Sequence, residues 1–149
     1  MEEADEFKAM EEANEFSVSA ETRAKVVALR HALLRLHKAL LEDERIRYES
    51  ARGSVESSGA LLQLVLHDEW FAYLRPLSAL VVQMDELLDA DEATEREAEA
   101  LVALAKELLI FGEKDAGLGE RYRAALQRAP EVVMAHAEFV KLLGDRKTA

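Results

Sequence analysis

The chain has 149 residues, a length that fits one domain, and its 30 acidic against 19 basic residues give a net charge of −11. That charge argues against a nucleic-acid partner, because a phosphate backbone would be repelled, and the absence of cysteine excludes disulfides, thiolate metal ligands and cysteine nucleophiles. The acidic start is unlike a signal peptide and no apolar run approaches the roughly 20 residues of a membrane span, so we expect a cytoplasmic protein without a membrane partner.

Residues 1–17 form an acidic extension, which we expect to be partly disordered or a frayed helix. The sequence EEADEF at 2–7 recurs as EEANEF at 11–16, and neighbouring carboxylates repel one another. Phe7 and Phe16 lie on no continuous apolar stripe. The alternative is a docking peptide for a basic groove. Residues 18–149 then form the helical bundle domain.

A first long helix is predicted to follow this extension. Either Ser17 or Ser19 can cap its start. Apolar residues then recur every three or four positions, which is typical of a helix with one buried face. The pattern continues to Arg52 and stops at Gly53, where the flexible sequence GSVESSG begins a linker.

Residues 60–89 are expected to form a kinked helix. The apolar face turns by about a third of a turn across positions 67–69, so either the helix bends there or Asp68 caps a new one. Pro76 adds a second discontinuity, because it lacks an amide donor and its ring clashes with the carbonyl of Ala72.

The remaining sequence predicts three further helices. Asp89 or Asp91 can cap the first, which ends at Gly112, and Pro130 begins the last, which ends before Gly144. The fold class is therefore all-α, an antiparallel helical bundle of about four main helices, one of them kinked near Pro76, plus the short acidic N-terminal extension. The side chains that we expect to be buried in these last helices are Leu101, Leu104, Ala105, Leu108, Phe111, Tyr122, Ala125, Leu126, Val132, Val133, Phe139, Val140 and Leu143.

Three polar residues share one direction on the first helix, because Arg30, His37 and Glu44 are spaced seven residues apart. Polar groups on a buried face need partners. One interpretation is a polar layer that is hydrogen-bonded across helices. The alternative is an internal pocket for a metal, haem or small apolar ligand, to which His136 on the last helix would also contribute.

A resident metal or cofactor is not expected. Di-iron bundles place a glutamate three residues before a histidine on each of two helices. Here the residues three before the four histidines are Ala28, Leu34, Leu64 and Val133. No arrangement of acid, base and nucleophile is visible either, so we predict no catalytic residue and favour a role other than catalysis.

The sequence HDEW at 67–70 begins the main group of aromatic residues. Adjacent helical residues point about 100° apart, so His67 and Asp68 cannot face each other within one helix. If the helix breaks there, His67 can instead line a pocket. Trp70, Phe71 and Tyr73 are either core side chains or an exposed contact surface, since aromatic residues dominate the energetics of protein interfaces.

These observations favour a small cytosolic helical protein–protein interaction module that can self-associate. The apolar stripes are wider than one bundle core can cover, which points to a further contact surface. The interaction candidates are Trp70, Phe71, Tyr73, Phe7 and Phe16. The pocket candidates of the alternative function, ligand binding inside the bundle, are Arg30, His37, Glu44, His67 and His136.

Overall fold

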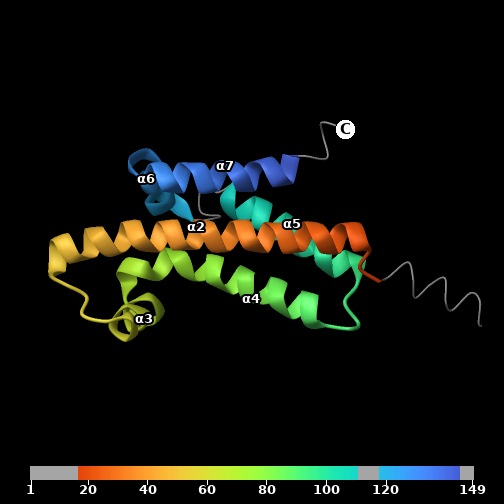
Figure 1. The fold of residues 1–149 in the computed structure, drawn as a ribbon, viewed down its shortest axis with the longest axis horizontal. Coiled ribbons are helices and arrows are strands. Elements are labelled where there is room, and N and C mark those ends of the chain that lie inside the picture. Colours follow the sequence, from red (N-terminus) through yellow and green to blue (C-terminus); the bar gives the residue numbers. More distant parts are fainter. Residues whose placement is uncertain (1–16, 111–117, 145–149) are drawn as a thin grey trace, which may run out of the picture.

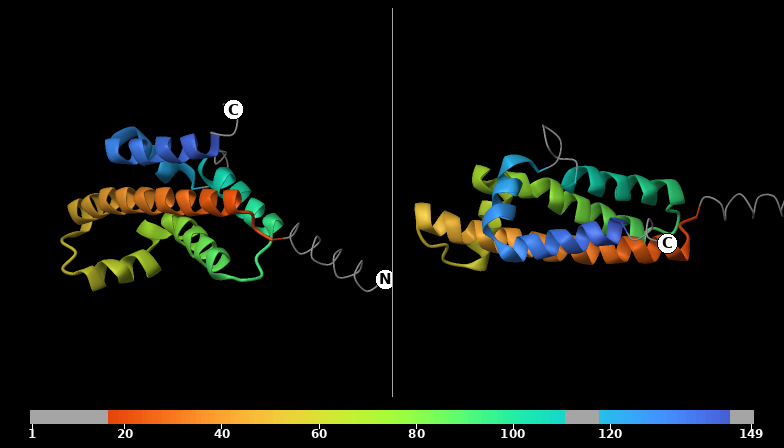
Figure 2. Two further views of the ribbon diagram at one scale, coloured as in Figure 1. Left: turned by 45° about the vertical axis from the view of Figure 1, so that its right-hand side comes forward. Right: turned by 90° about the horizontal axis from the view of Figure 1, so that it is seen from above.

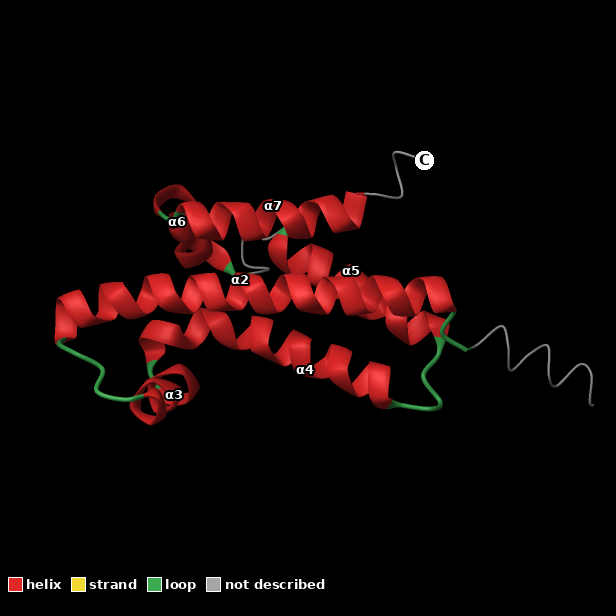
Figure 3. Cartoon of the chain, viewed as in Figure 1, coloured by secondary structure: helices red, strands yellow, loops and turns green. Residues whose placement is uncertain are grey.

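The computed structural model describes residues 17–110 and 118–144, and these residues are almost entirely helical (Figure 3). The helices in chain order are α2 (Ala20–Arg52), α3 (Ser58–His67), the 3-10 helix η1 (Glu69–Leu74), α4 (Arg75–Asp89), α5 (Glu95–Leu109), α6 (Gly119–Arg128) and α7 (Pro130–Gly144). The all-α prediction is confirmed. The acidic extension with Phe7 and Phe16 lies outside the described residues, as do Phe111 and Gly112.

Helix α2 is the central element, and α4, α5 and α7 pack against it. Helices α4 and α7 run opposite to α2 (Figures 1 and 2). The four main helices therefore form the antiparallel bundle that the sequence predicts. Helices α6 and η1 lie at one end of the bundle, and α3 lies outside it, below that same end in Figure 1. Within the described ranges, none of the helices combines the length and the apolar character needed to cross a bilayer.

The boundaries of α2 follow local signals. Ser19 is its cap, because the Ser19 hydroxyl accepts a hydrogen bond from the backbone N–H of Thr22 at 3.1 Å. The helix ends at Gly53, whose φ of 100° is a left-handed conformation that favours glycine. One side of α2 supplies a large part of the core, and its completely buried apolar side chains are Val26, Leu29, Leu33, Leu36 and Leu40.

Residues 60–89 do not form one kinked helix, which corrects the sequence prediction. Asp68 caps a new element, since its carboxylate accepts a hydrogen bond from the backbone N–H of Trp70 at 2.9 Å. Pro76 lies in the first turn of α4 and so begins a helix instead of bending one. A backbone N–H in that turn has no partner within the helix, so proline costs nothing there.

The cap of α5 also differs from the prediction, because Thr94 takes the place expected of Asp89 or Asp91. The Thr94 hydroxyl accepts from the backbone N–H of Glu97 at 3.1 Å and donates to the Glu97 carboxylate, also at 3.1 Å. The first of these bonds caps the helix, and the second links the two side chains. Of the two expected caps, Asp89 is the last residue of α4, and Asp91 lies three residues before Thr94 in the connection between the helices.

Replacing Thr94 with alanine is expected to lower the free energy of unfolding by about 1 kcal/mol, because the N–H of Glu97 loses its acceptor. Asp91→Ala is the matched control, and it should change stability by less than about 0.5 kcal/mol, as is usual for exposed positions. Urea denaturation followed by circular dichroism measures both. Equal losses in the two variants would contradict the assignment of the cap.

Three side chains expected in the core lie at the surface instead. Leu104, Val133 and Val140 are 42%, 45% and 38% exposed. Helices α5 and α7 carry apolar stripes wider than the side that touches the bundle, so the outer edge of each stripe remains uncovered. Of the other predicted core residues in the described ranges, Ala105, Tyr122, Ala125, Val132 and Phe139 are buried, and Leu101, Leu108, Leu126 and Leu143 are partly buried.

Candidate functional site

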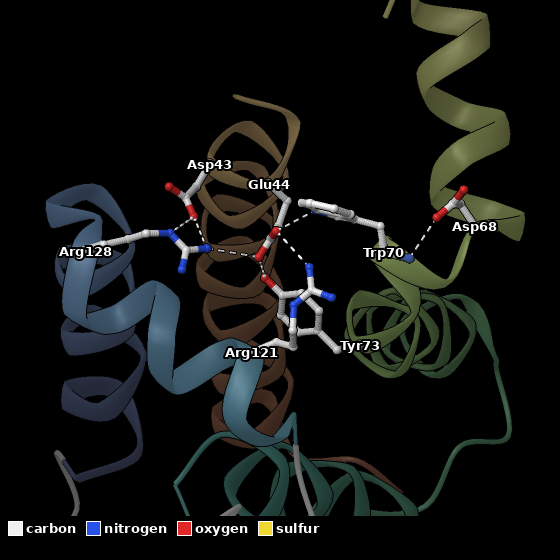
Figure 4. A network of polar contacts seen from close by, with 7 residues as sticks. All are labelled: Asp43, Glu44, Asp68, Trp70, Tyr73, Arg121 and Arg128. Carbon is white, nitrogen blue, oxygen red and sulfur yellow. Dashed lines mark hydrogen bonds and ion pairs between the residues drawn. The ribbon is translucent and has the colours of Figure 1, made fainter. Parts of the chain in front are cut away.

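A fully buried carboxylate lies where α2, η1 and α6 meet (Figure 4). Glu44 accepts hydrogen bonds from the indole N–H of Trp70 at 3.0 Å and the hydroxyl of Tyr73 at 2.6 Å. Two guanidinium groups from α6 complete the set, with Arg121 at 3.1 Å and Arg128 at 3.2 Å. Four donors from two other elements thus converge on one side chain of α2.

The charges in this cluster balance. Arg128 also donates to the carboxylate of Asp43 through Nε at 2.9 Å, so two carboxylates face two guanidinium groups. A buried carboxylate is costly unless it is paired and hydrogen-bonded, and here both conditions hold. Burial and the hydrogen bond to Glu44 raise the pKa of Tyr73, which keeps its hydroxyl protonated as a donor.

An aromatic layer covers the buried carboxylate. The guanidinium carbon of Arg121 lies 5.3 Å from the ring centroid of Trp70 and 5.4 Å from that of Tyr73, which are cation–π distances. Tyr48 packs edge-on against Trp70 with ring centroids 5.5 Å apart. Trp70 and Tyr73 are therefore partly buried and engaged within the chain. Phe71 is fully buried, which places it in the core and removes it as a surface contact.

The buried cluster also fixes the position of α3. Arg75, the first residue of α4, donates to the backbone carbonyls of Asp68 at 2.7 Å and Val65 at 3.2 Å. These contacts tie the C-terminal end of α3 to the start of α4. Because Trp70 and Tyr73 anchor η1 to Glu44, and α3 packs on η1, the carboxylate holds α3 in place indirectly. We call Glu44 and its four donors the Glu44 clamp.

The chemistry of the Glu44 clamp suits positioning. Within residues 17–110 and 118–144, every buried side-chain nitrogen or oxygen has a hydrogen-bond partner. A carboxylate with four donors has no lone pair left to abstract a proton. The arrangement can therefore hold three elements together, and it presents no unsatisfied group to a substrate.

The other polar residues of the α2 stripe contact α4. Arg30 forms an ion pair with Asp85, and the Nε2 of His37 lies 2.9 Å from the hydroxyl of Ser78. Burial lowers the pKa of His37, which favours the neutral imidazole. Glu44 is hydrogen-bonded to η1 and α6. Arg30, His37 and Glu44 therefore each have a partner on another helix. These contacts fit the interpretation as a hydrogen-bonded polar layer.

The two other histidines among the pocket candidates, His136 and His67, lie elsewhere. His136 forms a hydrogen bond with the hydroxyl of Tyr122 on α6, so His37 and His136 are engaged with different helices. Burial lowers the pKa of His136. His67 is exposed at the end of α3. In the part of the chain that the structure describes, no three His, Asp or Glu side chains are grouped so as to hold a metal ion.

Sequence reasoning missed the two arginines of the clamp. Arg121 and Arg128 are 77 and 84 residues from Glu44 in the chain, and no local pattern links them to it. The one signal was the acidic residue on an apolar face, which requires a partner of opposite charge. It does not say which arginine supplies that charge.

The most exposed apolar element of the fold is α3. Its sequence, SGALLQLVLH, contains no Asp, Glu, Lys or Arg, and none of its residues is fully buried. Leu61, Leu64 and Val65 pack partly against the core. On the opposite side, Leu62 and Leu66 are 54% and 50% exposed. These two leucines lie one turn apart, and we call the surface that they form the α3 outer face.

Comparison with known proteins adds no relative: no protein-family model, no curated protein and no solved structure matches this chain.

Proposed function

We propose that this protein is a small helical protein–protein interaction module, that its contact surface is the α3 outer face, and that a second copy of the chain binds there. The observation that carries the proposal is the exposure of α3, which is an apolar helix at the edge of the bundle and has no fully buried residue. An exposed apolar surface loses contact with water when a partner covers it, which is favourable.

The absence of charge on the α3 outer face makes a second copy a suitable occupant. Two chains with a net charge of −11 each repel one another, so they associate best through a surface that carries no charge. The α3 outer face meets this condition. In a two-fold symmetric dimer the same surface of both subunits is in contact, so Leu62 and Leu66 of one copy would pack against the same pair in the other.

The Glu44 clamp supports this role because it fixes the helix that makes the contact. Trp70 and Tyr73 hold η1 against α2, and Arg75 holds the end of α3. A contact helix that is already in place loses less conformational freedom on binding than a mobile one. The clamp is thus a positioning device for α3.

The oligomeric state tests the proposal. We expect sedimentation velocity over a dilution series to show a dimer that dissociates at low concentration. The double variant Leu62→Glu with Leu66→Glu should be monomeric, because each added carboxylate would be desolvated beside another. Both leucines are at least half exposed, so circular dichroism should show unchanged helix content.

Met134→Glu is the matched control, since Met134 is 72% exposed on α7, on the other side of α2 from α3 (Figure 1). It should remain dimeric. A monomeric wild-type chain at every concentration, or equal dissociation of the control, would contradict the proposal.

A cytoplasmic location belongs to the same proposal, and the support for it is a chain that has no cysteine and so needs no oxidising compartment. Ligand binding near His37 and His136 is not proposed as a second function, because each histidine has its own hydrogen-bond partner on a different helix.

A further inference from the structure

A second surface lies between α4 and α5, which are adjacent antiparallel helices joined by a short connection (Figures 1 and 2). A groove open to solvent runs along their junction. One stripe of each helix lines this groove. On α4 and its C-cap the lining positions are 83, 86, 87 and 90, and on α5 they are 97, 100, 101 and 104. In both sets the successive positions are three, one and three residues apart, which keeps each set on one helical face.

The floor of this groove is apolar. It consists of Leu87, Ala100, Leu101 and Leu104, of which Leu104 is 42% exposed. Helix α5 turns a different side toward the core, where Ala98 and Ala105 are fully buried. Leu87 and Leu101 at the bottom of the groove also pack on the core, whereas Leu104 remains largely exposed, so the bundle covers this face only in part.

The edges of the groove are acidic. Glu86 lines it from α4 and Glu97 from α5, and no ion pair within the described residues involves either carboxylate. Residues 75–110 hold nine carboxylates against three basic residues, a net charge of −6 that is more than half of the charge of the chain. Of those three basic residues, Arg75 does not line the groove and donates to the backbone carbonyls of Val65 and Asp68.

We propose that this groove binds a basic amphipathic helix of a partner protein. The apolar face of such a helix would cover Leu101 and Leu104, and lysine or arginine side chains on its flanks would meet Glu86 and Glu97. Laying an amphipathic helix into an apolar groove is a recurrent mode of peptide recognition. Charge selects the partner, because an apolar helix with acidic flanks would be repelled.

The acidic groove edges argue against the acidic extension of this chain as the occupant. Residues 1–16 carry seven carboxylates and a single lysine, so the acidic extension is repelled from the groove. The proposal is independent of self-association, because the groove and the α3 outer face share no residue.

Fluorescence anisotropy with labelled model peptides tests the proposal on the full chain. The probe is an amphipathic helix of leucine and lysine with leucines spaced three and four residues apart. One comparison peptide replaces every lysine with glutamate, and a second has the leucines and lysines in scrambled order. We expect saturable binding of the first peptide alone, weakened by added salt because the flanking charges are screened.

Three variants locate the binding site. Glu86→Lys should weaken binding of the leucine–lysine peptide about tenfold, because it replaces an attraction with a repulsion. Leu104→Gln should also weaken it, since it removes part of the apolar floor without changing charge. Glu99→Lys is the matched control, because Glu99 lies on the side of α5 that faces the start of α2. It should leave the affinity unchanged to within about twofold.

Equal weakening by Glu86→Lys and Glu99→Lys would mean that the peptide follows net charge, and it would overturn the proposal. So would binding of the glutamate peptide or of the scrambled peptide with equal affinity, and so would no binding at all. The Leu62→Glu with Leu66→Glu variant should bind the peptide as the wild type does, so failure of this proposal and failure of the dimer are distinguishable.

Discussion

Replacing Glu44 with glutamine is expected to lower the free energy of unfolding by about 3 kcal/mol. Removing one partner of a buried ion pair costs about 3–5 kcal/mol when the remaining charge stays buried. Here the lower end applies, because Arg121 and Arg128 retain 45% and 27% side-chain exposure and can turn toward water. The hydrogen bonds of Trp70 and Tyr73 are affected more strongly than those of the arginines. The amide nitrogen of glutamine is a donor, so one of these two side chains is left without an acceptor.

Chemical denaturation measures this loss, and Glu42→Gln is the matched control. Glu42 lies two residues away on α2, its side chain is 58% exposed, and its contact with Arg45 is 3.8 Å long. The same change of charge at that position should alter stability by less than about 0.5 kcal/mol. If the two variants were equally stable, Glu44 would not be the centre of a clamp.

Replacing Phe71 with alanine is expected to cost about 3–5 kcal/mol, the range for deleting a buried phenylalanine side chain. Phe71 is 0% exposed and packs against Tyr48 with ring centroids 5.7 Å apart. The change would leave a cavity beneath η1 that neighbouring side chains fill only in part. Thermal and urea unfolding of the purified variant measure the loss.

Met134→Ala is the comparison for Phe71→Ala, because Met134 is a large apolar side chain that is 72% exposed. It should change the free energy of unfolding by less than about 0.5 kcal/mol. A stable Phe71→Ala variant with impaired self-association would instead mean that Phe71 is a contact residue, and that the core assignment is wrong.

The sequence was most informative where structure depends on neighbouring residues. The residue types themselves indicate the helix ends: Ser19 caps the start of α2, Gly53 ends it, and Pro130 begins α7. The helix break at Asp68 was one of two alternatives, and the structure selects it. The short 3-10 helix had no distinct pattern, because six residues are too few to show a period.

The candidate site depends on residues far apart in the chain, so only its separate residues could be predicted from the sequence. Glu44 was predicted as a pocket residue, and Trp70 and Tyr73 as interaction residues, whereas the structure brings all three together. Their joint role follows from how η1 folds back on α2, which apolar spacing does not encode. The exposure of the α3 leucines could not be predicted from the sequence either. A helix that is apolar on every side is normally buried, so its composition indicates a core position.

Site-specific cross-linking tests the central claim, self-association through α3, most directly. The chain contains no cysteine, so Gln63→Cys introduces a single thiol on an exposed position of α3 beside the two leucines of the outer face. A short bismaleimide reagent should join two copies of that variant covalently and should not join copies carrying Met134→Cys. Adding Leu62→Glu to Gln63→Cys should abolish the product. Equal cross-linking at both positions, or none at either, would contradict the claim that two copies meet through α3.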